Sequence, residues 1–370
     1  MRNRNEDVTK IVSNNHLFII DLLNFINFIP AVPAVPAVSA VPGVKKLTKI
    51  DKKILHDFTQ QIRKIKGNSN KNQLKLLNVI TGTKLKEHIL RLKSENIDYM
   101  KQYQTITNNF INLINGEFSD NNSYSEQVVE SFNYFYSTLI MGKTYNREYG
   151  ISDAKLSDLI SIEEFRREWS LHSSCPYCDI TQLEFDSSSV DHFFPKKKYP
   201  LLSIYPSNLV VSCTACNDRL KKDELNIPCA HPYYDNVETF FSFHIDNDRV
   251  ISLKLNPSLS STEEAKINNY LDLFKIRERY NTNGKIIIED LEKNIRKNLV
   301  KELKYMQDLN YQNIFDFVEK ELLEQLRNLN SIKMARSFVK LQIDYINQLL
   351  RDEEYKEDLS GYLNQLYCSS

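Results

Sequence analysis

Four cysteines in two Cys-x2-Cys pairs are the residues of this sequence best suited to binding a metal. Cys175 and Cys178 form the first pair, and Cys213 and Cys216 form the second. Such pairs are typical of tetrahedral zinc sites, in which each thiolate sulfur lies about 2.3 Å from the metal. Four cysteines leave the metal no open coordination position, so we expect a structural Zn²⁺ ion rather than a catalytic one. The alternative, buried apolar cysteines without a metal, does not explain the paired spacing.

An adjacent carboxylate and imidazole, Asp191 and His192, lie between the two cysteine pairs. They stand in the apolar, strand-like run formed with Val190, Phe193 and Phe194. Hydrolysis of a phosphodiester requires a base that activates water and a hard cation that stabilises charge on the phosphate. The pair offers a residue suited to each task. The alternative for His192 alone is a hydrogen-bonded histidine of the core.

The order of these motifs resembles that of the HNH nucleases of the ββα-metal group. The motifs are Cys-x2-Cys from Cys175, Asp-His-x2-Pro from Asp191, Asn-Leu-Val from Asn208 and Cys-x2-Cys-Asn from Cys213. The match extends over residues 175–222. The resemblance implies a two-stranded hairpin followed by a helix, folded around one catalytic metal and held by the zinc.

The resemblance also implies a role for each matching residue. His192 would be the general base that deprotonates the attacking water, and Asp191 would ligate a catalytic Mg²⁺ or Mn²⁺ ion. Asn208 would hold the loop and the backbone of the histidine in register. Asn217 stands where the family name has its last histidine, and its amide oxygen would be a second and weaker ligand of the same ion.

Two groups of lysines flank these residues and are candidates for binding nucleic-acid phosphates: Lys196, Lys197 and Lys198, and then Lys221 and Lys222. Each group is equally well explained as a solvated run of charge. Between residues 165 and 224, eight basic and eight acidic side chains balance. We therefore expect this segment alone to bind DNA weakly.

The strongest local charge lies earlier in the chain, at residues 44–101. This window holds 15 lysines and arginines and five acidic residues, a net charge of +10, whereas the whole chain has a net charge of zero. Basic residues along a helical region are typical of a surface that binds a phosphate backbone. The alternative is a solvated, lysine-rich face.

The elements that position these residues are expected to be mostly helices. Only 8 of 370 residues are glycine, whereas all-β domains and glycine-cradled nucleotide folds depend on glycine at turns and phosphate loops. Alternating apolar residues at 240–245 and 250–255 predict one hairpin, and a helix with acidic residues in its first turn is expected from Thr262. The predicted fold is thus mainly α, with a small embedded ββα-metal (HNH) module held by a four-cysteine zinc site and a short β-hairpin after it.

These patterns divide the chain into five regions. The first three are an amphipathic N-terminal segment at 1–30, an Ala-Val-Pro linker at 31–43 and a basic helical domain at 44–164. The last two are the nuclease module at 165–236, whose two Cys-x2-Cys turns are its zinc knuckles, and the β-hairpin with a helical C-terminal domain at 237–370. Regular proline in the linker forbids helix and favours an extended spacer.

These observations predict a metal-dependent endonuclease that hydrolyses phosphodiester bonds in DNA. Residues 191–200 and 231–235 also resemble the PtuB-type HNH nucleases of Septu-like anti-phage systems, which implies a prokaryotic defence role beside an ATPase partner. The alternatives are a non-catalytic, zinc-stapled nucleic-acid-binding or adaptor protein, and an HNH nuclease that acts on RNA.

No stretch reaches the ~18 apolar residues of a membrane span, so we expect a cytoplasmic protein with no membrane partner. The sequence leaves the oligomeric state open.

Overall fold

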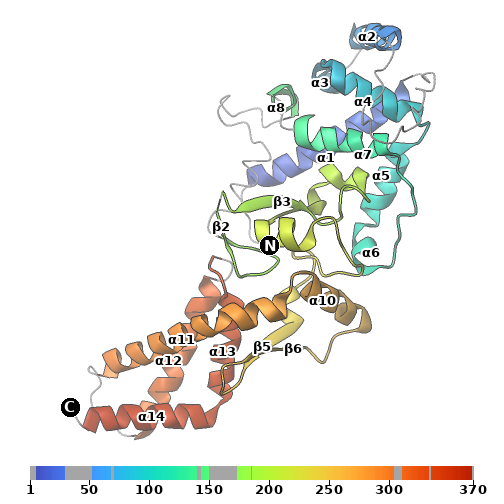
Figure 1. The fold of residues 1–370 in the computed structure, drawn as a ribbon. Helices are drawn as coiled ribbons and strands as arrows, with labels where there is room; N and C mark the ends of the chain where they lie inside the picture. The colour runs from blue at the N-terminus through green and yellow to red at the C-terminus, as the bar shows by residue number, and fades with distance from the viewer. Residues whose placement is uncertain are drawn as a thin grey trace. The chain divides into compact units, whose positions relative to one another are not determined.

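A computed structural model describes residues 6–29, 52–67, 71–139, 143–149, 173–184, 186–303, 311–332 and 335–368 (Figure 1). The Ala-Val-Pro linker at 31–43, residues 150–164 of the expected basic helical domain and residues 165–172 of the expected nuclease module lie outside these ranges. Most of the described residues are helical, which confirms the predicted mainly α fold.

The chain divides into two compact units. The first contains residues 1–169, 190–210 and 223–225, and the second contains residues 170–189, 211–222 and 226–370. The chain passes between the two units five times within the region 165–236, in which the sequence places the two cysteine pairs and the Asp-His pair.

The first unit is built from eight described α-helices and one π-helical turn. The helices are α1 (Glu6–Phe28), α2 (Lys52–Gly67), α3 (Lys71–Val79), α4 (Thr83–Ser94), α5 (Tyr99–Asn108), α6 (Phe110–Asn115), α7 (Glu126–Tyr134) and α8 (Lys143–Tyr149), and the π-helical turn spans Phe135–Leu139. A non-helical stretch separates α6 from α7.

Helix α1 forms the centre of this unit. Phe18, Leu22 and Ile26 recur at helical spacing and are fully or almost fully buried, with α3, α4, α5 and α8 packed around them. On α8, Tyr149 donates a hydrogen bond to Asp21 at 2.9 Å and places its ring edge-to-face against Phe18. The apolar N-terminal segment is thus a core helix of the protein.

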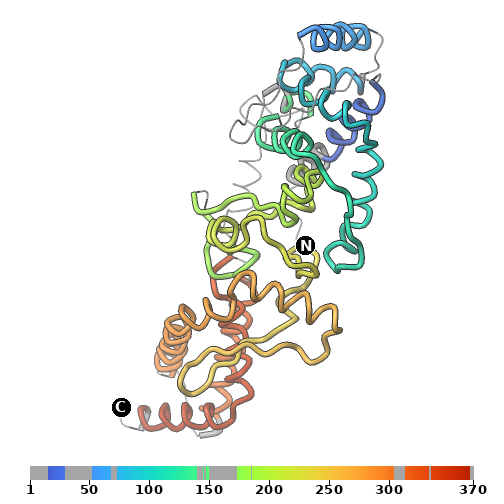
Figure 2. Tube along the Cα trace, turned by 45° about the vertical axis from the view of Figure 1, so that its right-hand side comes forward, coloured from blue at the N-terminus to red at the C-terminus, as the bar shows by residue number. Residues whose placement is uncertain are grey.

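The second unit combines a hairpin with five helices. Strands β5 (Phe241–Ile245) and β6 (Ile251–Leu255) pair antiparallel in the register Phe241–Leu255 to Ile245–Ile251, which confirms the predicted hairpin. The helices are α10 (Ser261–Leu273), α11 (Ile276–Leu303), α12 (Tyr311–Ser331), α13 (Val339–Arg351) and α14 (Glu353–Cys368). Figure 2 traces the yellow hairpin beside the orange and red helices, and α11 packs on β6 while α13 packs on β5.

Side chains of α13 occupy the free edge of β5. Asp344 accepts a hydrogen bond from the backbone nitrogen of Phe243 at 2.8 Å, and Gln348 both accepts from and donates to the backbone of Ile245. Because an exposed strand edge would otherwise present unpaired amides, these contacts fix α13 against the hairpin.

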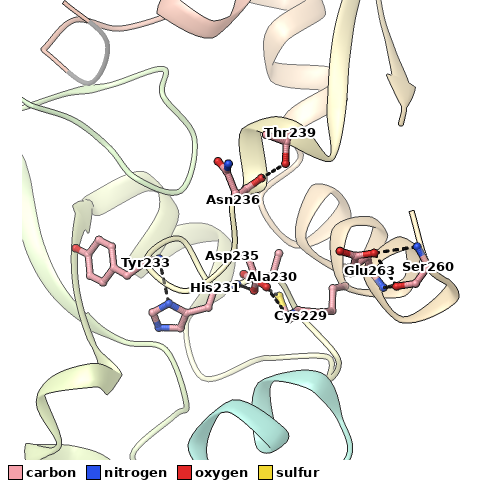
Figure 3. A network of polar contacts seen from close by, with 10 residues as sticks. Cys229, Ala230, His231, Tyr233, Asp235, Asn236, Thr239, Ser260 and Glu263 are labelled. Carbon is pink, nitrogen blue, oxygen red and sulfur yellow. Dashed lines mark hydrogen bonds and ion pairs between the residues drawn. The ribbon is translucent and has the colours of Figure 1, made fainter. Parts of the chain in front are cut away.

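The segment before the hairpin is tied to α10 by a buried polar network (Figure 3). Asp235 accepts from the backbone nitrogen of His231 at 2.7 Å and forms an ion pair with Lys266 of α10. Helix α10 itself begins with a capping box between Ser260 and Glu263, which confirms the acidic helix start predicted near Thr262. These contacts hold the chain that leaves the cysteine-rich segment on the helices of the second unit.

Two short strand pairs frame the cysteine-rich segment. Strands β1 (Ser173–Ser174) and β2 (Gln182–Leu183) pair antiparallel, and β3 (Ser188–His192) pairs with β4 (Leu209–Cys213). A π-helical segment, Ala215–Lys221, follows β4 directly. This segment contains Cys216 and Asn217.

Within the ranges that the structure describes, no helix combines the length and the apolar character that a membrane crossing needs.

Candidate functional site

The four paired cysteines converge on one buried point of the second unit. Cys175 follows β1, Cys178 lies in the next turn, Cys213 ends β4, and Cys216 lies in the π-helical segment. Their sulfur atoms all lie within 4.8 Å of one another, and none of these side chains is more than 3% exposed. All four are free thiols rather than disulfides.

This arrangement fits a tetrahedral metal site. A Zn²⁺ ion with Zn–S distances of about 2.3 Å requires sulfurs about 3.8 Å apart, which is compatible with four sulfurs that all lie within 4.8 Å of one another. The backbone supports the first knuckle, because the nitrogens of Cys178 and Asp179 both donate to the carbonyl oxygen of Cys175, at 3.2 and 2.8 Å. The cluster can therefore bind a metal such as zinc.

The protonation of the four thiols is strongly interdependent. Burial raises the pKa of the Cys175 thiol well above its ordinary value, whereas hydrogen bonds from Cys175, Cys178 and Cys216 lower the pKa of Cys213. Four close, buried sulfurs thus share protons among themselves. A divalent cation would replace these protons and hold all four as thiolates.

Side chains of helices α10 and α11 form hydrogen bonds with the first cysteine pair. Tyr270 donates a hydrogen bond to the carbonyl oxygen of Tyr177, and Tyr280 donates to the carbonyl oxygen of Cys178 at 2.9 Å. Arg279 donates directly to the sulfurs of Cys178 and Cys216. Burial acts to lower the pKa of Arg279, but Coulombic attraction to these two thiolates outweighs it and raises the pKa. The sequence contains no signal for these contacts, because the helices lie far along the chain from the cysteines.

His192 is the last residue of β3 and belongs to the first unit. Its ring is buried, and its Nε2 atom lies 2.8 Å from the carbonyl oxygen of Ser203. A carbonyl oxygen only accepts, so Nε2 carries the proton and donates it. In the neutral ring the lone pair is then on Nδ1, which makes Nδ1 the basic nitrogen.

The ring of Tyr136 lies against this imidazole, and Lys196 lies against Tyr136. The ring of Tyr136 meets the ring of His192 edge-to-face, with centroids 4.4 Å apart. The Nζ atom of Lys196 lies 5.1 Å from the centroid of the Tyr136 ring. Tyr136 is distant from His192 in the sequence, so its position beside the histidine is not predictable from the sequence.

Asn208 is fully buried and closes the loop that follows the histidine. Its Oδ1 atom accepts from the backbone nitrogen of Phe194 at 2.7 Å, and its Nδ2 atom donates to the carbonyl oxygens of Phe194 and Leu202. Its own carbonyl accepts from the nitrogen of Phe193, the residue after His192. These bonds fix the backbone on both sides of the loop.

The two residues expected to ligate a catalytic cation, Asp191 and Asn217, fall in different units. Asp191 is buried at the end of β3, in the first unit with His192 and Asn208. Asn217 belongs to the second unit with the cysteines, and its Nδ2 atom donates to the hydroxyl of Ser189 at 2.9 Å. A side-chain amide offers a metal its oxygen and not its nitrogen, so the amide oxygen is the atom with which Asn217 would ligate.

The five candidate phosphate-binding lysines differ in exposure. Lys197, Lys198 and Lys222 are exposed, and Lys196 is half-buried. Lys221 is fully buried, which differs from the sequence prediction, because a buried ammonium is not on a surface that a nucleic-acid backbone can reach. We therefore exclude Lys221 from the candidate interface.

Comparison with known proteins finds one local likeness. No family model matches the chain, and no solved structure matches it. Over 73 residues the chain is 41% identical to Protein ea31 of Escherichia phage lambda, and this stretch is 18% of the chain and 23% of the phage protein. The chain thus spans less than a quarter of the length of that relative. The function proposed below rests on the residues of the site.

Proposed function

We propose that the protein is a metal-dependent endonuclease of the HNH type that hydrolyses phosphodiester bonds in DNA. The observation that carries this proposal is the hydrogen bond from Nε2 of His192 to the carbonyl oxygen of Ser203. It leaves the basic lone pair of the ring on Nδ1, at the end of β3 and on the residue that follows Asp191 in the sequence. The strand pair β3–β4, followed at once by the helical segment 215–221, supports the ββα arrangement that the motifs imply.

In this proposal His192 takes a proton from the attacking water at Nδ1. The resulting imidazolium keeps its Nε2–H bond to the Ser203 carbonyl, whose negative dipole stabilises the new positive charge. Tyr136 packs against the ring and restricts its rotation. The chain therefore holds the base in one tautomer and one orientation before substrate arrives.

Asp191 and Asn217 would hold the Mg²⁺ or Mn²⁺ ion, since a carboxylate and an amide oxygen are hard ligands that suit these cations. Both assignments rest on the resemblance of residues 175–222 to the HNH motifs. When bound, such an ion stabilises negative charge on the phosphate and on the leaving oxygen. The four-cysteine cluster would hold a structural zinc that fixes the start of the π-helical segment.

The test is plasmid nicking by the full chain and by His192→Ala. General-base catalysis contributes about 10²–10⁴-fold, so the variant should lose activity by at least that lower factor. Zinc content and far-ultraviolet circular dichroism should stay at the wild-type values, because no cysteine is altered. Nicking by a pure, zinc-loaded His192→Ala sample at the wild-type rate would refute the proposal.

Two further experiments distinguish the proposed DNA endonuclease from the adaptor and from the RNA nuclease. The reaction should require Mg²⁺ or Mn²⁺ and stop with EDTA; binding without cleavage under all metal conditions would favour the adaptor alternative. Parallel digests of RNA and DNA of the same sequence distinguish the RNA nuclease. A role in anti-phage defence beside an ATPase partner is part of the proposal only through the resemblance of residues 191–200 and 231–235.

A further inference from the structure

A guanidinium lies against the four-cysteine cluster, and the predicted zinc chemistry does not account for it. Arg279 of α11 donates from Nη1 to the sulfur of Cys216 at 3.3 Å and from Nη2 to the sulfur of Cys178 at 3.4 Å. Nη1 also donates to the carbonyl oxygen of Phe274 at 3.2 Å. One planar group thus bridges one cysteine from each knuckle and is anchored to the chain just before its own helix.

The charge of a loaded cluster explains why a cation is placed there. A Zn²⁺ ion with four thiolates carries a net charge of −2, and burial of an uncompensated charge is costly. The cysteines are almost completely buried, and Arg279 itself is half-buried. Within the cysteine-rich segment and α10–α11, Arg279 is the cation for which the structure records hydrogen bonds to these sulfurs.

The geometry also affects the reactivity of the sulfurs. A zinc-bound thiolate reacts with alkylating agents and oxidants through a lone pair of its sulfur. An N–H group that donates to this lone pair withdraws electron density from it and makes the sulfur less reactive. A guanidinium presents two parallel N–H groups in a fixed plane, whereas a lysine ammonium is a single point charge. Simultaneous hydrogen bonds to Cys178 and Cys216, from Nη2 and Nη1, require the planar guanidinium. We call this pair of bonds the fork.

We propose that Arg279 is a positioning residue of the metal site, which neutralises part of the thiolate charge and protects the sulfurs of Cys178 and Cys216. Through it, helix α11 and the C-terminal helices are coupled to metal binding at a cluster more than 60 residues earlier in the chain. The proposal depends on the cluster holding a metal and not on nuclease activity, so it can fail or succeed independently of the proposed function.

The test compares Arg279→Gln with Arg277→Gln in the full, zinc-loaded chain. Arg277 lies on the same helix but is exposed and pairs with Asp272 and Asn268, so it is a matched control. Loss of an outer-shell partner typically weakens metal affinity 10–100-fold, and we expect zinc affinity in Arg279→Gln to fall by about that factor. Zinc release during treatment with N-ethylmaleimide should accelerate in Arg279→Gln alone.

A spectroscopic signature separates this role from general stability. With Co²⁺ in the cluster, the thiolate-to-metal charge-transfer bands should shift in Arg279→Gln and remain unchanged in Arg277→Gln. Arg279→Lys keeps the charge but loses the fork, so its zinc affinity should be intermediate, and it carries the test if the glutamine variant does not fold. Wild-type zinc affinity, release rate and Co²⁺ spectrum in either Arg279 variant would overturn the proposal.

Discussion

At the scale of single residues, Lys196 differs from the two lysines that follow it. It is half-buried, and its ammonium lies over the ring of Tyr136, which in turn contacts His192. Burial lowers the pKa of Lys196, and the charges of Asp223 and Asp191 oppose that shift. A cation held near the proposed base and metal ligand is suited to stabilising charge on one particular phosphate.

We therefore expect Lys196→Ala to lower the rate of cleavage and Lys197→Ala to weaken DNA binding. Loss of a preorganised group that stabilises transition-state charge costs about 10²–10³-fold in kcat, so Lys196→Ala should slow single-turnover nicking by about that factor at saturating enzyme. Lys197→Ala should weaken DNA binding a few-fold and leave the saturated rate unchanged, because an exposed lysine contributes only screened attraction.

Single-turnover nicking with excess enzyme and a separate binding titration check this prediction. Equal rates for the two variants at saturation would show that Lys196 acts only as part of a diffuse basic surface.

At the scale of elements, the packing of α11 depends on a glycine. A Cβ atom on Gly284 would approach side-chain atoms of Ile251 in β6 and Leu341 in α13 closer than 3.0 Å, a separation that real Cβ atoms essentially never show. Both of these neighbours are buried. The glycine thus allows α11 to contact the hairpin and α13 closely.

Gly284→Ala should destabilise the protein although alanine is the better helix former. Overpacking typically costs about 1–3 kcal/mol, which exceeds the gain of about 1 kcal/mol from helix propensity. Gly361→Ala in α14 is the matched control, since no atom lies within 4 Å of its Cβ position, and it should raise stability by up to about 1 kcal/mol. Urea midpoints followed by circular dichroism measure both, and equal stabilisation by the two alanines would contradict the close packing.

Local signals made several elements predictable from the sequence. The alternation of Phe241, Phe243 and Ile245 along one face predicted β5, and the acidic residues after Ser260 predicted the start of α10. The paired spacing of the cysteines predicted their cluster, because each knuckle is a local turn. In each case the residues that carry the signal are close together in the chain.

The surroundings of the site were not predictable, because they depend on contacts between distant residues. Arg279 binds the sulfur of a cysteine 101 residues earlier, and no spacing rule connects the two. Tyr136 contacts His192 from a helical turn in another region of the chain. The burial of Lys221 likewise follows from packing around the π-helical segment and not from its neighbours in the sequence.

At the scale of the whole molecule, the candidate catalytic residues and the metal cluster are divided between two units. Asp191, His192 and Asn208 belong to the first, and the four cysteines and Asn217 belong to the second. Strands β3 and β4 each begin in one unit and end in the other. The basic window of the sequence falls in the first unit, and within it helix α2 buries Phe58 and Ile62 and exposes its lysines and arginine.

This distribution predicts that α2 supplies much of the affinity for DNA. Replacing Lys52, Arg63 and Lys64 by glutamine removes three exposed charges from it. Each phosphate contact contributes about 0.9 to the slope of log affinity against log salt, so the slope should fall in magnitude by up to about 2.7. The same substitutions should leave zinc content unchanged, since these residues lie outside the cysteine cluster.

The matched control neutralises three exposed charges of the second unit, Lys285, Arg296 and Lys297 on α11. Both triple variants change the net charge of the chain equally, so any effect of overall charge is the same in each. Titrations of a fluorescent duplex at several salt concentrations should show the reduced slope only for the α2 variant. Equal slopes for the two variants would mean that DNA attraction arises from total charge, and the basic window would then be a solvated face with no role in binding.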